Sequence, residues 1–417
     1  MNLIKGFPVE QPASDFYGLG IAPKLIETLT RLKFKTPTSI QHKVIPIALE
    51  GKDLIGIAQT GTGKTISFAV PTVQQLSIHK FRALVLVPTR ELALQVEETF
   101  IKIASRFGIR TVSLIGGDPI RNQIRILQKL PRVLIATPGR LLDFLEQKKI
   151  RLHDIGILVL DEADRMLDMG FAPQIEEIFK NVNPDRQTMF FSATMPAAIM
   201  KMVAHYMKAP VCVEVAPSGT AAQHLTHELF IVRHEMKKDL LAKLLDRYRG
   251  PILLFCRTKR GASRISRDLR TFGHSCAEIH SDRSLAQRRA SLEGFRLGKY
   301  RVLVATDIAS RGIDVHGIEL VINYDLPDAP ENYVHRVGRT GRAGRAGHAI
   351  SLATPDQKRD ILNIEQMIRM VLPVSQHPDI PSASFEKHSA TRSFQKRSLV
   401  RKRPNYPSRS RKGTNSF

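Results

Sequence analysis

A glycine-rich stretch at residues 58–65 has the composition of a phosphate-binding loop. It reads Ala-Gln-Thr-Gly-Thr-Gly-Lys-Thr. Gly61 and Gly63 allow the tight turn that points successive backbone N–H groups at one anion. Lys64 can reach the β- and γ-phosphates of a nucleotide, and the hydroxyl of Thr65 can hold Mg²⁺. The stretch therefore predicts a site for a nucleotide and its magnesium ion.

The residues on either side of this loop have the pattern that such a loop needs. Asp53–Ile57 reads as a short buried strand, and Ile66–Val70 begins a helix. A helix N-terminus that follows a strand favours phosphate binding, because its free N–H groups and its dipole attract anions. A glycine-rich surface turn is the alternative, and this strand–loop–helix context argues against it.

Two adjacent carboxylates follow another apolar run. Asp161 and Glu162 come directly after Val159-Leu160. In parallel α/β sheets, ligands bind at the carboxyl ends of the strands. We expect Asp161 to hold Mg²⁺ through water, opposite Thr65, and Glu162 to position or deprotonate an attacking water. A solvated acidic turn is the alternative, and the upstream Gly-Lys-Thr sequence disfavours it.

The elements that must position these residues alternate between short apolar strands and helical patterns. This alternation predicts parallel sheets covered by helices. Helices are expected at 91–107 and 260–272. The clearest strand candidates are Ala83–Val87, Val133–Ala136, Ile157–Leu160, Thr188–Ser192, Ile252–Cys256, Arg301–Ala305 and Leu320–Asn323.

The two halves of the chain resemble each other in sequence. Residues 132–137 read Arg-Val-Leu-Ile-Ala-Thr, and residues 301–306 read Arg-Val-Leu-Val-Ala-Thr. Residues 84–91 and 252–259 also correspond in type, as do residues 156–161 and 317–322. We interpret this as one α/β unit used twice, with chance similarity between strands as the alternative. Only the first copy carries the phosphate loop, which predicts a nucleotide in a cleft that the second copy closes.

These patterns lead to a division into domains. We expect an N-terminal nucleotide-binding domain at residues 1–215. A linker at 216–225 contains a small, Pro- and Gly-containing stretch, which suits a flexible hinge. A second domain is expected at 226–375, and a tail at 376–417.

The net charge of +24 over 417 residues indicates a polyanionic partner, and nucleic acid is the commonest one in cells. Residues 381–417 alone hold ten Lys or Arg and one acid, Glu386. The tail has no helical or strand period, so we expect it to be disordered and to contact RNA, with a solubilising role as the alternative.

The remaining composition points to the cytoplasm. The sequence contains no run of eighteen apolar residues, so we expect no membrane span. The first residues lack the apolar core of a secretory signal. The three cysteines are widely spaced without a Cys-x-x-Cys pair, which favours reduced thiols over a disulfide or zinc site.

The motifs, taken in order, resemble those of DEAD-box ATP-dependent RNA helicases of the compact bacterial type. The resemblance covers roughly residues 16–355, and the family's phosphate loop also begins with alanine, as Ala58 does here. In the first half the motifs are Thr36–Gln41, Ala58–Thr65, Pro88–Leu92, Gly116-Gly117, Thr137–Arg140, Asp161–Asp164 and Ser192–Thr194; in the second half they are Ala305–Asp314 and His335–Arg342.

The resemblance implies two tandem RecA-like domains joined by a short hinge, and an RNA-stimulated ATPase that uses ATP and Mg²⁺. It implies local unwinding or remodelling of short RNA duplexes, in ribosome assembly, RNA decay or general RNA metabolism. We expect a monomer with possible ribosomal or RNA-decay protein partners and no membrane. An ATP-gated RNA clamp that hardly unwinds is the alternative. A DNA-translocating motor is disfavoured by Gln41 together with Asp164.

The resemblance makes residues 1–215 the ATP-binding domain, with an adenine-recognition segment at 14–42, and it assigns the nucleotide site. Gln41 has an amide that can donate and accept at once, which matches the edge of adenine. Phe16 and Phe34 are candidates to pack against the base, although core packing is nearly as good an interpretation of either. The loop itself contributes Ala58, Gln59, Thr60, Gly61, Thr62, Gly63, Lys64 and Thr65.

The second domain completes that site in the family. Arg339 and Arg342 would reach the γ-phosphate, because a guanidinium group forks onto phosphate oxygens and stays charged. Asp314 would approach the ribose. The catalytic set is thus Glu162, Lys64, Asp161, Arg339 and Arg342. Binding of RNA by this Gly- and Arg-rich run is the alternative.

RNA contacts are expected mainly to phosphate and sugar, with little sequence preference. Asp164 with Ser192 and Thr194 would link the acidic turn to the RNA surface, although the two hydroxyls could instead cap a helix near Pro196. The expected RNA-binding residues are Pro88, Thr89, Arg90, Gly116, Gly117, Thr137, Pro138, Gly139, Arg140, Arg257, Thr258, Thr306, His335 and Arg336.

Four positions depart from the family pattern. Ser39 stands where Pro is usual, Lys33 where Gly is common, and Ser281 where Gly normally follows His280. Leu285 replaces a common Gln. We expect Leu285 to weaken or reshape RNA contact in the second domain without abolishing ATP hydrolysis.

Overall fold

The computed structural model describes residues 15–58, 61–215, 225–307, 315, 317–341 and 346–385. By their contacts, the described residues all belong to one compact unit that ends at Phe385. Residues 216–224 of the predicted linker and residues 386–417 of the predicted tail lie outside the described residues. Within the described part, no helix is both long enough and apolar enough to cross a membrane.

The N-terminal lobe (residues 15–215) is built on a seven-stranded sheet in which every pairing is parallel. The strand order is β3-β4-β2-β5-β6-β1-β7. The central strands read as continuous apolar runs because both faces of the sheet are covered. The strands are β1 (Leu54–Ile57), β2 (Arg82–Leu86), β3 (Thr111–Leu114), β4 (Val133–Ala136), β5 (Ile155–Leu160), β6 (Gln187–Ser192) and β7 (Val211–Glu214).

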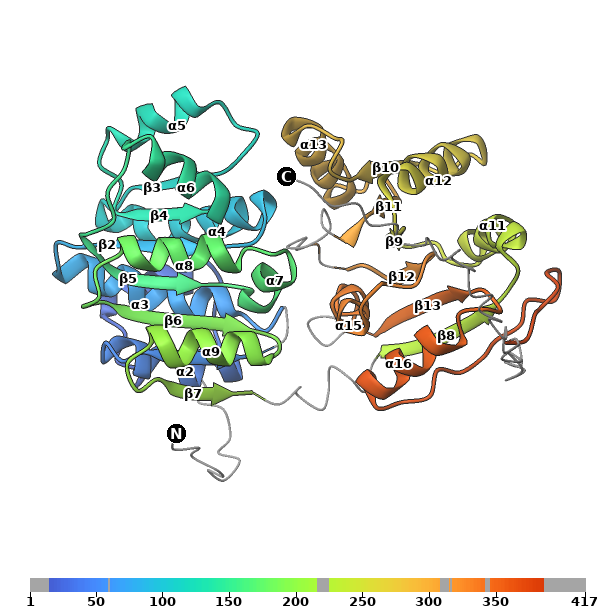
Figure 1. Cartoon of the computed structure of the whole chain (residues 1–417), viewed down its shortest axis with the longest axis horizontal. Coiled ribbons are helices and arrows are strands. Elements are labelled where there is room, and N and C mark those ends of the chain that lie inside the picture. The colour runs from blue at the N-terminus through green and yellow to red at the C-terminus, as the bar shows by residue number, and fades with distance from the viewer. Residues whose placement is uncertain are drawn as a thin grey trace, which may run out of the picture. The chain divides into compact units, whose positions relative to one another are not determined.

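Helices cover both faces of this sheet (Figure 1). Side chains alternate along a strand, so Val85 packs into one apolar cluster, while Leu84 and Leu86 pack into another. Helices α3 and α4 contribute Phe68 and Phe100 to the first cluster, and α6, α8 and α9 cover the second. The helices are α1 (Pro23–Arg31), α2 (Ser39–Leu49), α3 (Lys64–Ile78), α4 (Arg90–Ala104), α5 (Ile120–Leu127), α6 (Pro138–Glu146), α7 (Ala163–Asp168), α8 (Ala172–Asn181) and α9 (Ala197–Tyr206).

The C-terminal lobe (residues 225–385) has a six-stranded parallel sheet with the order β10-β11-β9-β12-β13-β8. Its strands are β8 (Leu225–Ile231), β9 (Ile252–Phe255), β10 (Cys276–Ile279), β11 (Val302–Ala305), β12 (Leu320–Asn323) and β13 (Gly347–Ala353). Its helices are α11 (Lys237–Arg247), α12 (Lys259–Thr271), α13 (Leu285–Arg296), α15 (Pro330–Val337) and α16 (Lys358–Ile368).

The two sheets have the same topology. If β8 to β13 are matched in chain order with β1 to β6, the order β10-β11-β9-β12-β13-β8 becomes β3-β4-β2-β5-β6-β1. The three sequence correspondences fall on matched strands, since residues 132–137 and 301–306 contain β4 and β11. The topology therefore agrees with the interpretation of one unit used twice and argues against chance similarity.

The last described residues pack against β8. The N–H of Ser375 donates to the carbonyl of Leu229 at 2.8 Å, and the N–H of Ala383 donates to the carbonyl of Ile231 at 2.8 Å. Ile380 is buried in the apolar cluster of this lobe. Residues 375–383 are thus part of the folded lobe, although the exact domain limits stay predictions.

Candidate nucleotide and RNA site

The phosphate loop follows β1 and leads into α3. Gly61 and Gly63 have φ of 85° and 92°, a left-handed region that glycine adopts without strain. Gly63 is the residue that caps α3, so the loop ends on a free helix N-terminus. Thr62, Lys64 and Thr65 continue this segment, while Gln59 and Thr60 lie outside the described residues.

Lys64 points back across its own loop. Its Nζ donates to the carbonyl of Ala58 at 2.6 Å, and the residue is buried. Burial lowers the pKa of Lys64, and the nearby charge of Asp161 acts in the opposite direction. A buried ammonium group beside a carboxylate is suited to an anion that arrives with a metal ion, because both charges are then balanced locally.

Asp161 lies at the carboxyl end of β5 with 3% of its surface exposed. Its Oδ1 accepts a hydrogen bond from the N–H of Glu162 at 3.0 Å. Burial raises the pKa of Asp161 to about 7, although the charge of Lys64 opposes this effect. A cation bound at this carboxylate would favour the ionised form, as expected for a magnesium ligand.

Glu162 has an unusual backbone conformation for a residue with a side chain. Its φ of 54° and ψ of 48° are left-handed, and it is the residue that caps α7. The Glu162 carboxylate accepts a hydrogen bond from Nη1 of Arg165 at 3.0 Å, and both side chains are buried. Sequence reasoning did not identify Arg165. The spacing of three residues between an acid and a base at a helix start was the signal that could have found it.

Asp164 joins the acidic turn to the end of β6. Its Oδ2 accepts hydrogen bonds from the N–H of Ala193 at 3.0 Å, the N–H of Thr194 at 2.9 Å and the hydroxyl of Thr194 at 3.0 Å. The N–H of Asp164 in turn donates to the hydroxyl of Ser192 at 3.3 Å. Helix α9 begins after Pro196 without a side-chain cap. The two hydroxyls therefore serve the acidic turn and do not cap that helix.

Gln41 connects α2 to the phosphate loop. Its Oε1 accepts from the N–H of Thr38 at 2.9 Å, and its Nε2 donates to the carbonyl of Gly63 at 3.1 Å. An amide has two donor hydrogens and two acceptor lone pairs, so one of each remains. Adenine presents a donor and an acceptor on one edge, which is the complement of what remains on Gln41.

The two candidate aromatic residues differ in exposure. Phe16 is 3% exposed and belongs to the apolar core, so its side chain packs inside the lobe. Phe34 is 38% exposed and stays available for a base. Lys33 has a φ of 65°, which is a physical reason for the glycine common at that position in the family.

The expected RNA-binding residues of the N-terminal lobe follow β2, β3 and β4. Thr89 caps α4 by accepting from the N–H of Leu92 at 3.2 Å. A side chain added at Gly116 or Gly117 would collide with the guanidinium of Arg90, so both glycines allow that group to approach the backbone. Arg140 donates to the carbonyl of Asp118 at 3.2 Å. Thr137, Pro138 and Gly139 lead into α6 from the end of β4.

These placements put the candidate residues along one sheet edge. The order β3-β4-β2-β5-β6-β1 places the RNA candidates after its first three strands. The acidic turn, the Ser192–Thr194 segment and the phosphate loop follow β5, β6 and β1. The Asp164–Thr194 hydrogen bonds connect the ends of β5 and β6 within this edge.

The C-terminal lobe places its candidates on the corresponding edge of its own sheet. Thr258 follows β9 and caps α12, accepting from the N–H of Gly261 at 3.0 Å. Arg257 is exposed beside Asp328, with 3.1 Å between the guanidinium and the carboxylate. Thr306 directly follows β11.

Arg336 is a structural residue of this lobe. Its guanidinium donates to both carboxylate oxygens of Asp307, at 2.6 and 2.7 Å, and to the amide oxygen of Asn323 at 3.1 Å. It is 2% exposed, and this burial argues against the contact with RNA that the sequence predicts. That contact stays a prediction. His335 is partly buried, and Arg339 is buried with its Nε donating to the carbonyl of His335 at 3.3 Å. Arg342 and Asp314 lie outside the described residues.

Leu285 is the first residue of α13, directly after the cap formed by Ser284 and Gln287. It is an apolar residue that begins this helix in place of a polar one. The effect of position 285 on RNA contact stays a prediction.

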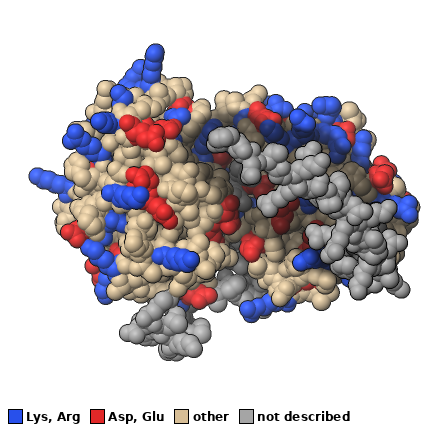
Figure 2. Space-filling model, in the orientation of Figure 1, with Lys and Arg blue, Asp and Glu red and all other residues tan. Residues whose placement is uncertain are grey.

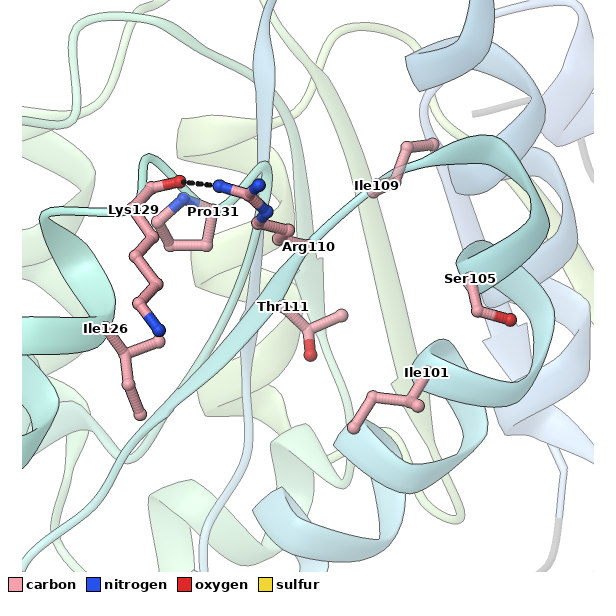
Figure 3. Close-up of a pocket in the computed structure, with 8 residues that line it drawn as sticks. All are labelled: Ile101, Ser105, Ile109, Arg110, Thr111, Ile126, Lys129 and Pro131. Atoms are coloured by element: carbon pink, nitrogen blue, oxygen red, sulfur yellow. Dashed lines mark hydrogen bonds between the residues drawn. The ribbon is translucent and has the colours of Figure 1, made fainter.

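A pocket of about 380 Å³ lies elsewhere on the N-terminal lobe (Figure 3). Its lining residues come from the ends of α4 and α5 and from the segments that lead into β3 and β4, at the edge opposite the phosphate loop. Ligands of parallel sheets bind at the other edge, so this pocket is separate from the candidate site. It is lined by Ile101, Ser105, Ile109, Arg110, Thr111, Ile126, Lys129 and Pro131.

Comparison with known proteins gives the same interpretation of both lobes. The DEAD/DEAH box helicase family model matches residues 38–202, and that of the helicase conserved C-terminal domain matches residues 236–344. The ATP-dependent rRNA helicase RRP3 of Meyerozyma guilliermondii is 39% identical over 94% of this chain and 86% of its own length. The ATP-dependent RNA helicase CshA of Listeria monocytogenes is 41% identical over 87% of this chain and 70% of its own.

Similar solved structures support the same interpretation of the two lobes. S. cerevisiae Dbp5 bound to RNA and ADP-BeF3 is similar with a TM-score of 0.77 and 29% identity, covering 87% of this chain and 96% of its own. Mss116p bound to ssRNA and AMP-PNP is similar with a TM-score of 0.79 and 27% identity, covering 86% and 78%. The two sheets and their motifs define a helicase with two RecA-like domains. The chain belongs to the DEAD-box family of ATP-dependent RNA helicases.

Proposed function

We propose that this chain hydrolyses ATP to separate or remodel short RNA duplexes, with the residue roles given below. The observation that supports this most is the single sheet edge of the N-terminal lobe. The phosphate loop and acidic turn lie at its β5-β6-β1 half and the RNA candidates at its β3-β4-β2 half. Asp164, Ser192 and Thr194 form a hydrogen-bonded connection from the acidic turn to the end of β6.

The nucleotide is held by the backbone of the loop and by Lys64, with Gln41 selecting adenine. Glu162 orients or deprotonates the attacking water, and Arg165 holds the Glu162 carboxylate in place. Arg339 and Arg342 stabilise the charge that develops on the transferred phosphoryl group, an effect worth on the order of 10³-fold in rate for such arginines.

The residues present fit a magnesium ion. Asp161 is a buried carboxylate with a raised pKa, and Thr65 supplies a partly exposed hydroxyl. No group of three or more His, Cys, Asp or Glu that could hold a metal occurs among the described residues. Magnesium commonly uses one or two protein oxygens together with phosphates and waters, so this sparse set is the expected one. When bound, the ion would neutralise phosphate charge.

RNA is bound through its backbone by the segments after β2, β3 and β4 and by Arg257, Thr258 and Thr306. Such contacts carry little sequence information. The relatives named rRNA helicases support structured ribosomal RNA as one substrate. We place the activity in the cytoplasm, and we expect a monomer.

The experiment is strand release from a short RNA duplex, measured together with ATP hydrolysis. We expect release that requires ATP and Mg²⁺, and hydrolysis stimulated by single-stranded RNA far more than by DNA of the same sequence. ATP hydrolysis without strand release would favour an ATP-gated clamp. Equal stimulation by DNA would contradict the proposal.

A further inference from the structure

Helix α12 exposes a cationic face to solvent. Its opposite face buries Ala262, Ile265, Ser266 and Leu269 against the sheet. The exposed side chains include five cations and only one acid occurs in the helix, Asp268. Figure 2 shows Lys and Arg side chains gathered over this helix. The five are Lys259, Arg260, Arg264, Arg267 and Arg270.

Three of these cations have neither an ion pair nor a hydrogen bond among the described residues. Lys259 pairs with Asp282 at 2.7 Å, and Nε of Arg270 donates to the carbonyl of Cys276 at 3.2 Å. Arg260, Arg264 and Arg267 form no ion pair with any acid in the part of the chain that the structure describes. Asp268, the acid nearest in sequence, pairs with Lys238 at 3.4 Å instead.

These three residues, the α12 arginine row, lie on one face of the helix. Their spacing of four and then three residues brings each side chain next to the following one. The row extends about 10 Å along the helix axis, from about 1.5 Å of rise per residue. Like charges at this spacing repel each other and destabilise a helix. An anion bound along the row would remove that cost.

The chemistry of the row favours phosphate over an acidic protein surface. All three side chains are arginines, which fork onto phosphate oxygens with two hydrogen bonds. Protein interfaces usually centre on exposed aromatic or aliphatic anchors. No large apolar side chain is exposed on residues 259–271, and the one that follows, Phe272, is 45% exposed with Nζ of Lys238 over its ring at 5.1 Å. A solvated helix face is the simpler alternative, and it is what the experiment must exclude.

The position of α12 suggests which part of an RNA it meets. The helix begins directly after Arg257 and Thr258, at the carboxyl end of β9. The row therefore runs away from the edge where the C-terminal lobe places its RNA candidates. We propose that the α12 arginine row binds phosphates of an RNA segment beyond the strand held at that edge, such as the flanking duplex. This inference rests on the proposed binding of RNA by the core.

The test uses the full chain and two RNAs, a ten-nucleotide single strand and the same strand joined to a stable hairpin. The variant carries Arg260→Gln, Arg264→Gln and Arg267→Gln together. The control carries Lys358→Gln, Arg359→Gln and Arg369→Gln, which removes the same charge from exposed positions on and after α16 of the same lobe. Dissociation constants are measured over a range of KCl concentrations.

We expect the magnitude of the slope of log affinity against log salt for the hairpin RNA to decrease by about 2 in the variant. Each lost phosphate contact contributes about 0.7 to 0.9 to this slope. Its affinity at low salt should fall about tenfold or more, and binding of the single strand should stay within twofold. The control should keep the wild-type slope. ATP hydrolysis stimulated by the single strand confirms that the variant is folded.

Equal slopes in variant and control would overturn the inference and leave a solvated face as the explanation. Loss of binding to an oligoglutamate probe with an unchanged RNA slope would overturn it in favour of an acidic protein partner. If the wild-type chain shows no RNA-stimulated ATP hydrolysis, the proposed function fails first. If that activity is present and the variant and the control have equal salt slopes, only the inference about the α12 arginine row fails.

Discussion

Among single residues, Glu162 combines a strained backbone with a fixed side chain. A left-handed conformation costs a non-glycine residue on the order of 1 kcal/mol, and such residues cluster at functional sites. The Arg165 guanidinium, 3.0 Å away, fixes the direction of the Glu162 carboxylate. We interpret Arg165 as a positioning residue, because it contacts the proposed catalytic carboxylate.

Replacement of Arg165 tests this interpretation. Arg165→Gln leaves Glu162 buried without its cation, so we expect the free energy of unfolding to fall by about 3 kcal/mol. The kcat for ATP should fall at least tenfold, while KM for ATP changes little. The double variant Glu162→Gln/Arg165→Gln should recover part of the stability lost in the single one, because no unpaired charge remains. Wild-type kcat in Arg165→Gln would contradict the assignment.

Asp161 gives a prediction about pH. Its pKa of about 7 is raised by burial, so the folded chain keeps a proton that the unfolded chain releases between about pH 4 and 7. The contribution of Asp161 to the free energy of unfolding therefore falls as pH rises through this window. Asp161→Asn removes this dependence. The free energy of unfolding, measured in urea without Mg²⁺, should decrease more from pH 5 to pH 8 in the wild type than in the variant. An equal change in both proteins would refute the prediction.

At the scale of elements, hydrogen bonds connect the ends of β5 and β6 within the half of the sheet edge that holds the nucleotide candidates. Asp164 accepts two backbone N–H groups and the Thr194 hydroxyl. Because the two N–H groups remain when the hydroxyls are removed, the acidic turn should keep its place. The hydroxyls of Ser192 and Thr194 would then stabilise the conformation of the segment that follows β6.

The variant Ser192→Ala/Thr194→Ala should therefore separate two activities. We expect ATP hydrolysis to stay within about threefold of wild type and the rate of duplex release to fall at least tenfold. Each lost hydrogen bond should cost about 1 kcal/mol of stability. Both rates are measured on the same RNA at saturating ATP. A parallel fall of both would show that these hydroxyls support hydrolysis itself.

The sequence predicted most of these elements, because strands of a parallel sheet are short apolar runs between turn residues. The strand predicted at Val133–Ala136 is β4, and that at Leu320–Asn323 is β12. The phosphate loop and acidic turn were also found, since their spacing is itself the signal. The sequence left open whether Phe16 packs in the core and did not predict the bond from Gln41 to Gly63, because both depend on how α2 and the preceding segment pack against the loop.

For the whole molecule, charge is the dominant property. The chain carries +24, and ten of its Lys and Arg residues lie beyond Phe385. The folded lobe includes residues up to 385, since Ala383 is hydrogen-bonded to β8. A truncation after Phe385 therefore removes the basic tail and leaves the packed segment intact.

We expect this truncation to weaken RNA affinity and to flatten its salt dependence, because fewer counterions are released. ATP hydrolysis at saturating RNA should be retained, since the phosphate loop and acidic turn are untouched. Titration of one RNA at several salt concentrations, with the full chain as control, measures both effects. An unchanged slope would assign the tail a role other than RNA binding.

The central claim is that the edge of the N-terminal sheet hydrolyses ATP in response to RNA, with Glu162 acting on the attacking water. The most direct measurement is steady-state ATP hydrolysis of wild type and Glu162→Gln, with and without single-stranded RNA, beside the affinity for ATP. We predict that the wild type is strongly stimulated by RNA. The variant should bind ATP within about threefold of wild type and lose at least 99% of the stimulated rate, about 3 kcal/mol of transition-state stabilisation. Substantial RNA-stimulated hydrolysis by Glu162→Gln would contradict the account.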